Sequence, residues 1–447
     1  MTLKISVIGT GYLGATHAAC MAELGFDVIG VDVDPQKIER LSVGDLPFHE
    51  PGLPELLVKH VQSGRLRFTT DYAEVGGWAD VHFIGVGTPE RIADGGADIS
   101  FVDAAARSLA QHITRDALVV GKSTVPVGTA RRLAELLAKE SREGVELEVA
   151  WNPEFLREGF AVKDTLAPGR LVFGVESAQA TDQLCEVYAQ ALGQDTPLIV
   201  TDFETAELVK VAANAFLATK ISFINAFSEV TETVGGDIRT LADALGYDER
   251  IGRKFLNAGI GFGGGCLPKD IRALQTRVSE LGLNHTMDFL HNVDDINLRR
   301  RDRVVSLAHQ ILDHEVVGRR IAVLGVAFKP DSDDVRDSPA LDVAGRLFND
   351  GAEVIVYDPQ GNENARRRFP RLGYADSVAE ATQDADLVLL LTEWKEFKEL
   401  TPADLRPRVR GMRLIAGRNV LDHGQWTEAG WTVAALGRMF PDPAGQL

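Results

Sequence analysis

Cysteine is scarce in this sequence, with only Cys20, Cys185 and Cys266 among 447 residues. So few cysteines, in an odd number, predict no disulfide framework, and the lack of a C-x-x-C pair argues against a zinc ribbon. The longest apolar runs, such as 387–391, are far too short to span a bilayer, and the first residues do not resemble a signal peptide. We therefore expect a cytoplasmic protein with no metal site and no membrane partner.

Basic residues are in the minority. The 47 Lys and Arg residues stand against 65 Asp and Glu, which gives a formal net charge of −18. A chain this acidic is a poor candidate for binding nucleic acid, so we expect no such partner. Hydrophobic residues make up 45% of the sequence, which is enough to form the cores of two or three domains.

Short apolar runs alternate with helical patterns in two parts of the sequence. The runs of the first part are 5–8, 28–31, 82–86 and 118–120, and those of the second part are 320–324, 353–357 and 386–392. This alternation predicts an α/β fold with two Rossmann-like, doubly wound domains. Between them, 203–235 lacks proline and interior glycine and predicts a helix of about 45 Å. Apolar residues surround much of this helix, which predicts burial on most sides and a role as a spine between domains and subunits.

A glycine fingerprint follows the first apolar run. Gly9, Gly11 and Gly14 are spaced G-x-G-x-x-G, and Asp32 ends the next strand 18 residues later. Such glycines allow a tight turn and bring a pyrophosphate close to a helix N-terminus. Asp32 would accept from ribose hydroxyls and repel a 2′-phosphate, which favours NAD over NADP. The alternative is a purely structural turn.

A second glycine-rich segment, 261–265, precedes Cys266. Pro268 suits the first turn of a helix, so Cys266 would lie just before a helix N-terminus, where the dipole lowers a thiol pKa. Asp270 would lie in the first turn and reach back toward the thiol. The pattern favours a nucleophilic Cys266, against the alternative of a small buried side chain. The less favoured alternative for Asp270 is an ordinary helix-start acid.

The long helix carries Lys210 and Asn214 four positions apart and therefore on one face. Both are costly to bury without partners, which indicates function; the alternative is an exposed stripe in which Glu207 pairs with Lys210. Two polar runs remain ambiguous. The run 123–129 offers hydroxyls to a ligand or caps a helix, and 151–159 is a ligand loop or a surface turn.

Taken together and in this order, these motifs resemble the UDP-glucose 6-dehydrogenase family, within the UDP-glucose/GDP-mannose dehydrogenase group. The resemblance runs nearly from end to end and includes 87–89, 123–129, 152–159, Phe328-Lys329 and Arg336. It implies a four-electron oxidation of a nucleotide sugar at C6, with NAD as cofactor. The steps lead through an aldehyde, a thiohemiacetal and a Cys266 thioester, which water then hydrolyses.

The resemblance also implies roles for individual residues. The catalytic residues would be Cys266, Lys210, Asp270, Asn214, Glu154 and Thr124. The cofactor would contact Gly9, Gly11, Tyr12, Leu13, Gly14, Asp32, Lys37, Thr88, Thr124, Glu158 and Arg336. The substrate would contact Phe155, Leu156, Arg157, Lys210, Asn214, Arg250, Asn257, Gly259, Gly261, Phe262, Gly263, Phe328, Lys329 and Arg418. Read singly, the cations Arg250, Lys329, Arg336 and Arg418 could each be ordinary surface charges.

The resemblance further implies three domains: residues 1–200 bind NAD, 201–314 form a helical dimerisation domain with the cysteine loop, and 315–447 bind the UDP-sugar. Arg250 resembles an arginine that reaches a neighbouring subunit, so a homodimer or higher homo-oligomer is expected. The open alternatives are the same chemistry on GDP-mannose or a UDP-N-acetylhexosamine, a sensor without turnover, and a two-electron 3-hydroxyacid dehydrogenase. The presence of Cys266, Lys210 and Asp270 argues against a sensor, and Cys266 and the second α/β part argue against the two-electron dehydrogenase.

Overall fold

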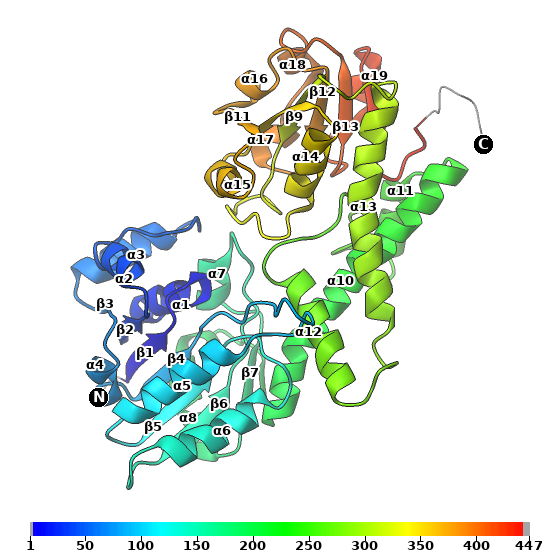
Figure 1. Ribbon diagram of the computed structural model, residues 1–447. Coiled ribbons are helices and arrows are strands. Elements are labelled where there is room, and N and C mark those ends of the chain that lie inside the picture. The colour runs from blue at the N-terminus through cyan, green and yellow to red at the C-terminus, as the bar shows by residue number, and fades with distance from the viewer. Residues whose placement is uncertain (1–2, 441–447) are drawn as a thin grey trace. The chain divides into compact units, whose positions relative to one another are not determined.

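The computed structural model describes residues 3–440, and the chain divides into two compact units (Figure 1). The first unit contains Met1–Ala213 and Arg272–Leu283, and the second contains Asn214–Ile271 and Asn284–Leu447. Helices α10 (Phe203–Val234) and α12 (Leu267–Glu280) each contribute residues to both units. Among the described residues, no helix combines the length and the apolar character needed to cross a bilayer.

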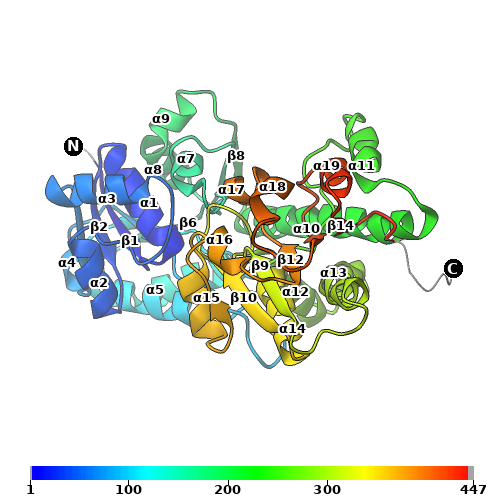
Figure 2. The ribbon, with the colours of Figure 1, turned by 90° about the horizontal axis from the view of Figure 1, so that it is seen from above.

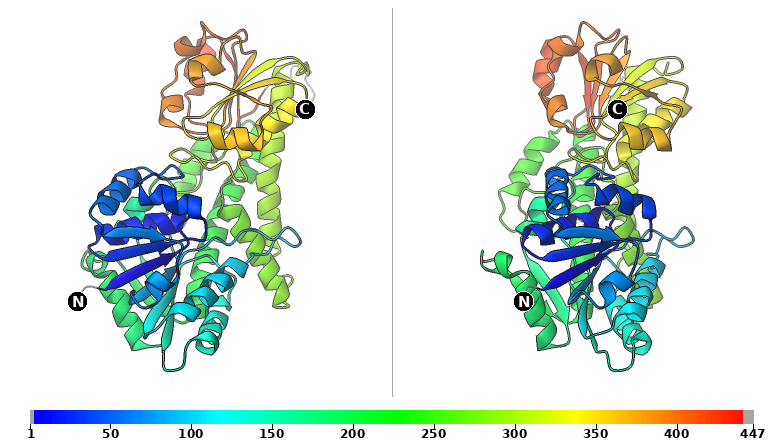
Figure 3. Two further views of the ribbon diagram at one scale, coloured as in Figure 1. Left: turned by 60° about the vertical axis from the view of Figure 1, so that its left-hand side comes forward. Right: turned by 90° about the vertical axis from the view of Figure 1, so that its left-hand side faces the viewer.

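The first unit is built on an eight-stranded sheet with the order β3-β2-β1-β4-β5-β6-β7-β8, parallel except between β6 and β7. Neighbouring strands β1 and β2 are visible in blue in both views of Figure 3. The strands are β1 (Lys4–Ile8), β2 (Asp27–Val31), β3 (Leu66–Thr69), β4 (Val81–Ile84), β5 (Ala117–Gly121), β6 (Leu147–Trp151), β7 (Leu171–Val175) and β8 (Leu198–Thr201).

Helices cover both faces of this sheet because its buried strands alternate side chains between two cores. Ile5 and Val7 pack with α1, α3 and α8, whereas Ile8 packs with α5, α6 and the start of α10. The helices are α1 (Tyr12–Glu23), α2 (Pro35–Ser42), α3 (Leu53–Gln62), α4 (Ala73–Gly76), α5 (Ser100–His112), α6 (Thr129–Glu140), α7 (Ala161–Leu166), α8 (Ala178–Val187) and α9 (Ala189–Leu192).

The second unit repeats the design with a six-stranded parallel sheet in the order β11-β10-β9-β12-β13-β14. Its first strand, β9, lies between the second and the fourth, as β1 does in the first unit, and this order is that of a Rossmann fold. The strands are β9 (Arg320–Leu324), β10 (Glu353–Tyr357), β11 (Gly373–Tyr374), β12 (Leu387–Leu390), β13 (Arg413–Ala416) and β14 (Thr432–Ala435).

Two layers of helices cover this second sheet. Helices α13 and α14, side by side in Figure 2, pack on the face that carries Val323, and α16 to α19 contribute to the core around Leu324. The remaining helices are α11 (Ile238–Gly246), α13 (Phe289–Ile311), α14 (Pro339–Asn349), α15 (Asn362–Arg368), α16 (Val378–Ala381), α17 (Lys395–Lys398), α18 (Pro402–Leu405) and α19 (His423–Glu428). The prediction of two Rossmann-like sheets and a long helix is confirmed.

Helix α10 differs from its predicted burial in one respect. Its 32 residues span about 48 Å. From Phe216 to its C-terminal end, however, a stripe of large apolar side chains is exposed in the single chain: Phe216, Phe223, Phe227, Val230 and Val234. The prediction that this helix is buried on most sides is therefore wrong for one face.

Candidate active site

The glycine-rich turn between β1 and α1 has room for a ligand. Gly9 has a φ of +88°, and a Cβ on Gly14 would lie 1.7 Å from the carbonyl oxygen of Gly9, so both positions require glycine. A Cβ on Gly11 would meet no atom within 4 Å. In the described chain, α1 has no side-chain cap and no acid in its first turn. These features fit the pyrophosphate of a dinucleotide.

Asp32 follows β2 and is buried. Its Oδ2 accepts from the amide of Thr10 and from Lys37 Nζ, each at 2.8 Å. Burial alone would raise the pKa of Asp32, but the Lys37 hydrogen bond and the amides of Thr10 and Asp34 hold it below its usual range. Asp32 is thus an ionised acceptor, as discrimination against a 2′-phosphate requires.

The ends of β4 and β5 are tied together. The Thr88 hydroxyl donates to the Thr124 carbonyl oxygen at 2.8 Å, and the Ser123 hydroxyl donates to that of Val86 at 2.6 Å. The alternative in which a side chain of 123–129 caps the next helix is not what the structure shows, because α6 begins after Gly128 without a local side-chain cap.

Glu207 of α10 binds the start of α6 instead. Its carboxylate accepts from the amides of Gly128 at 2.7 Å and Ala130 at 2.6 Å, and it is 2% exposed. Burial raises the pKa of Glu207 to about 7, although these amides act in the opposite direction. From the sequence, Glu207 was predicted only as the alternative partner of Lys210.

Lys210 is buried and pairs with a residue far away in the sequence. Its Nζ lies 2.9 Å from Glu154 Oε1, and it lies 5.7 Å from the centre of the Phe155 ring. The other carboxylate oxygen of Glu154 accepts from the Leu156 amide at 2.7 Å. The alternative of an exposed stripe with a Glu207–Lys210 pair is therefore wrong, and the structure brings together two of the predicted catalytic residues.

The second unit brings together another pair. Asn214 Nδ2 donates to Asp270 Oδ2 at 2.6 Å, and Lys269 Nζ lies 2.8 Å from Asp270 Oδ1. Asn214 and Asp270 are 8% and 3% exposed, whereas Cys266, directly before α12, is exposed. An exposed thiol with a buried, hydrogen-bonded carboxylate one helical turn away suits covalent catalysis.

The glycines before Cys266 permit close packing. The Gly264 amide donates to the Arg336 carbonyl oxygen at 2.9 Å. A Cβ on Gly264 would lie 2.9 Å from the Phe328 ring, and one on Gly265 would lie 2.4 Å from the guanidinium carbon of Arg336. Side chains here would displace Phe328 and Arg336, so the glycines place both of these predicted binding residues against the cysteine loop.

Arg418 supports the same loop from the end of β13. Its guanidinium donates to the carbonyl oxygens of Gly261 at 2.8 Å and Leu391 at 3.0 Å, so it is not an isolated surface charge. Two asparagines that the sequence analysis missed complete this support. Asn225 accepts from the Gly259 amide at 2.9 Å, and Asn297 accepts from the Phe262 amide at 2.7 Å. Neither lies in a motif, so no local signal distinguishes them.

The other predicted residues divide between the units as follows. The first unit contains Gly9, Gly11, Tyr12, Leu13, Gly14, Asp32, Lys37, Thr88, Thr124, Glu154, Phe155, Leu156, Arg157, Glu158 and Lys210, and the second contains Asn214, Arg250, Asn257, Gly259, Gly261, Phe262, Gly263, Cys266, Asp270, Phe328, Lys329, Arg336 and Arg418. Several have local partners: Tyr12 with Glu50, Arg157 with Asp164, Arg250 with Asp248, Asn257 with Arg253, and Lys329 with the Phe328 ring.

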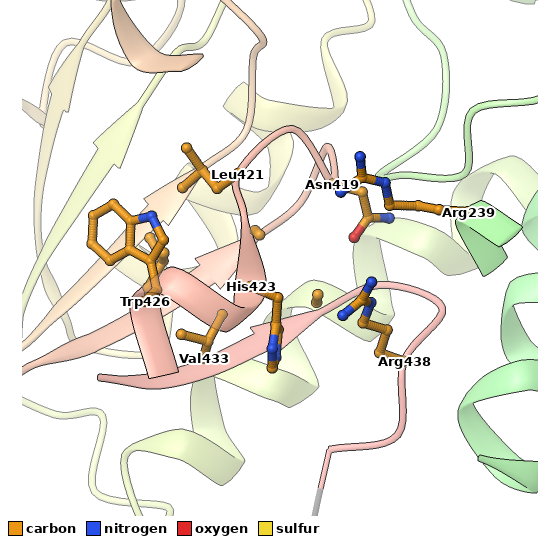
Figure 4. A pocket seen from close by; sticks show the side chains of 10 residues that line it. Arg239, Asn419, Leu421, His423, Trp426, Val433 and Arg438 are labelled. Carbon is orange, nitrogen blue, oxygen red and sulfur yellow. The ribbon is translucent and has the colours of Figure 1, made fainter. Parts of the chain in front are cut away.

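A small cavity lies beside β13 and β14 in the second unit (Figure 4). Its volume of about 10 Å³ is enough for one water molecule. The Asn419 amide on its wall donates to the carbonyl oxygens of Ala258 and Leu436, and Arg438 pairs with Asp237. These contacts stabilise the fold of the second unit, and none of the residues was predicted as a site residue. Within residues 3–440 no cluster of three His, Cys, Asp or Glu side chains suits a metal ion.

Three consecutive segments match models of one family's domains. Residues 3–192 match the NAD binding domain of the UDP-glucose/GDP-mannose dehydrogenase family, 204–299 its central domain, and 322–423 its UDP binding domain. The chain is 41% identical to a UDP-glucose 6-dehydrogenase of Rhizobium meliloti, over 98% of this chain and all of that one. It is 40% identical to UDP-glucose 6-dehydrogenase TuaD of Bacillus subtilis, over 97% of this chain and 93% of that one.

Solved structures extend the likeness. A UDP-glucose dehydrogenase from Pyrobaculum islandicum superposes with a TM-score of 0.87 at 39% identity, covering 94% of this chain and 95% of that one. A UDP-D-ManNAc dehydrogenase from Pyrococcus horikoshii superposes with a TM-score of 0.85 at 28% identity, covering 98% and 99%.

Proposed function

Because the chain belongs to the UDP-glucose/GDP-mannose dehydrogenase family, an NAD-binding group of oxidoreductases, we propose that it oxidises UDP-glucose to UDP-glucuronate. The substrate rests on relatives at about 40% identity that are named UDP-glucose 6-dehydrogenase along nearly their whole length. The observation that carries the chemistry is the exposed Cys266 beside the buried Asp270–Asn214 pair. A thiol placed in this way allows both oxidations to proceed without release of an aldehyde.

The cofactor site is proposed in the first unit, where the glycine turn and Asp32 fit the pyrophosphate and a ribose of NAD. Thr88, Thr124 and Glu158 are further contacts by family resemblance, and so is Arg336. When bound, NAD accepts a hydride from the substrate carbon in each of the two oxidations.

The protein residues supply proton transfer and charge stabilisation in these oxidations. Lys210 and Asp270 accept or hold the proton that leaves the C6 hydroxyl, and the amide of Asn214 stabilises developing negative charge on that oxygen. The Cys266 sulfur then adds to the aldehyde carbon and forms a thiohemiacetal, whose oxidation leaves a thioester on Cys266. Lys210 and Asn214 are one turn apart on α10, so the helix itself sets their spacing.

Water hydrolyses the thioester in the last step, and the Cys266 thiol is regenerated as the carboxylate leaves. Thr124 and Glu154 would position this water. The ion pair with Lys210 keeps the carboxylate of Glu154 oriented. The uridine diphosphate would meet a few placed cations, among them Lys329 and Arg418, which is how an acidic chain binds an anion.

We also propose a homodimer or a higher homo-oligomer, formed through the exposed stripe of α10. Its members are spaced by 7, 4, 3 and 4 residues, which is the spacing of a helix–helix seam, and the exposed fractions of Phe216 and Val234 are 66% and 70%. Arg250, whose side chain is 88% exposed, would reach the substrate of the neighbouring subunit.

The division into residues 1–200, 201–314 and 315–447 remains a proposal about function, supported by the similar limits of the three family domains. The cytoplasm is the proposed compartment, because a catalytic thiol needs reducing conditions and the reaction consumes NAD.

The test is the yield of NADH per nucleotide sugar consumed, with GDP-mannose and UDP-N-acetylmannosamine assayed in parallel with UDP-glucose. Two NADH per UDP-glucose, with the other sugars inert, is expected. Two NADH from another sugar alone would overturn the substrate and keep the chemistry, and one NADH would overturn the covalent route.

The variant Cys266→Ser separates this proposal from a two-electron dehydrogenase. It is expected to abolish acid formation from UDP-glucose, whereas Cys185→Ser, a half-buried cysteine outside the proposed site, is expected to behave as the wild type. Unchanged turnover in Cys266→Ser would refute the thioester.

A further inference from the structure

A buried lysine lies next to the proposed catalytic residues and has no part in the mechanism above. Lys122 directly follows β5 and is 7% exposed. Its Nζ donates to Asn152 Oδ1 at 2.9 Å and to the Tyr188 hydroxyl at 3.1 Å, and that hydroxyl donates to the same Asn152 oxygen at 2.6 Å. The three side chains therefore form one closed network inside the first unit.

Asn152 connects this network to the proposed site. It directly follows β6 and is separated from Glu154 only by Pro153. The amide nitrogen Nδ2 of Asn152 donates to the Val172 carbonyl oxygen at 3.1 Å, so both ends of the side-chain amide are held by hydrogen bonds. Pro153 restricts the backbone between Asn152 and Glu154, and a displacement of Asn152 would therefore move the Glu154 carboxylate.

Lys122 has no acidic partner: within the described part of the chain it forms no ion pair. Burial lowers its pKa to about 8, while the charge of Glu154 raises that pKa and the charge of Lys210 lowers it. The other groups around it are neutral. The Phe83 and Tyr188 rings each lie 5.7 Å from Nζ, and burial together with the Lys122 charge holds the pKa of His17 well below its usual value.

We propose that Lys122 is a positioning residue for the reaction: it holds the loop that carries Glu154, and its positive charge sets the proton balance of the Lys210–Glu154 pair. This inference rests on the proposed roles of Lys210 and Glu154. While Lys122 is charged, it attracts the carboxylate of Glu154 and repels the ammonium group of Lys210, and loss of the charge removes both effects. Loss of the hydrogen bonds loosens the loop.

The first test is the pH dependence of kcat/KM for wild type, Lys122→Met and Tyr188→Phe. The Met variant is expected to shift the acid limb upward by about half a pH unit or more, and to leave the alkaline limb nearly in place because Lys122 has largely lost its charge above pH 8. The control Tyr188→Phe removes one hydroxyl from the network but keeps the charge, so it should lower the thermal midpoint and leave the limbs in place. Superimposable profiles for wild type and Lys122→Met would overturn the electrostatic part.

If the Met variant does not fold, the variant Lys122→Arg tests the effect of the charge at position 122. Arginine keeps its charge at every pH, whereas Lys122 loses its charge near pH 8. The alkaline limb of Lys122→Arg should therefore lie below that of the wild type, with the acid limb unchanged. Coincidence of the two alkaline limbs would overturn the proposal.

A measurement that needs no activity separates this inference from the proposed function. Amide hydrogen exchange of the loop 152–160 is expected to be at least about tenfold faster in Lys122→Met than in wild type, with α5 unchanged as an internal reference. Unchanged exchange in the loop would overturn the positioning role, even for a protein that makes no NADH from UDP-glucose. Conversely, faster exchange in an inactive protein would leave the positioning role intact and refute only the proposed reaction.

Discussion

Glu207 should make the stability of this protein depend on pH in an unusual direction. The carboxylate is buried and caps the start of α6 through the amides of Gly128 and Ala130. Burial raises its pKa to about 7 in the folded chain, against about 4.3 in an unfolded chain. Between these two values the folded protein binds the proton more tightly, so Glu207 stabilises the fold most below about pH 4 and loses this contribution as the pH rises through 7.

The size of the effect follows from the pKa difference. A difference of about 2.7 pKa units corresponds to about 3 to 4 kcal/mol of unfolding free energy between pH 4 and pH 8. The Glu207→Gln variant has nearly the same shape and cannot ionise. Its stability relative to wild type should therefore rise by roughly 2 to 3 kcal/mol when the pH is raised from 5 to 8.

The assay is urea unfolding followed by tryptophan fluorescence, performed on wild type and variant at pH 5, 6, 7 and 8. Glu204→Gln is the matched control, one turn earlier on α10. Glu204 is partly exposed, and its hydrogen bond with Arg131 lowers its pKa, so its variant should lack the trend. A stability difference between wild type and Glu207→Gln that stays constant across this range would refute the raised pKa of the buried carboxylate.

Three further predictions concern the cofactor and the assembly. Gly11→Ala should weaken NAD binding at least about tenfold at an unchanged thermal midpoint, because its Cβ enters open space that the pyrophosphate needs. Gly14→Ala should lower the thermal midpoint as well, because its Cβ would overlap a backbone carbonyl. Calorimetry measures the binding, and thermal unfolding measures the midpoint. Asp32→Ser should lower the NAD to NADP ratio of kcat/KM at least about tenfold in steady-state assays, because it removes the repulsion of a 2′-phosphate. Phe223→Asp should yield monomers in light scattering, with Thr233→Asp on the same helix as control; an unchanged assembly would show that the stripe is not the interface.

Local patterns in the sequence were sufficient to predict most of the fold. The apolar runs became parallel strands of two sheets, and the segment free of proline and glycine became α10. Gly9 and Gly14 of the fingerprint, and the glycines before Cys266, adopt the tight geometry that their residue type implies. Each of these features depends on a few consecutive residues, so periodicity and backbone freedom determine it.

Pairing of the charged groups could not be predicted in the same way. The sequence offered Glu207 as the nearest partner of Lys210, but the folded chain pairs Lys210 with Glu154 and turns Glu207 toward the amides of α6. Although Asn152 begins the motif 152–159, nothing in the sequence indicated its network with Lys122 and Tyr188.

The sequence by itself therefore determined which helices and strands form and which residues have side chains suited to catalysis or ligand binding. Tertiary structure alone decided which of those residues are buried, which meet, and at what pH they ionise. The physical reason is that strand and helix periodicity acts over a few residues, whereas desolvation and ion pairing depend on side chains that distant elements bring together, as β5, β6 and α10 do around Lys210.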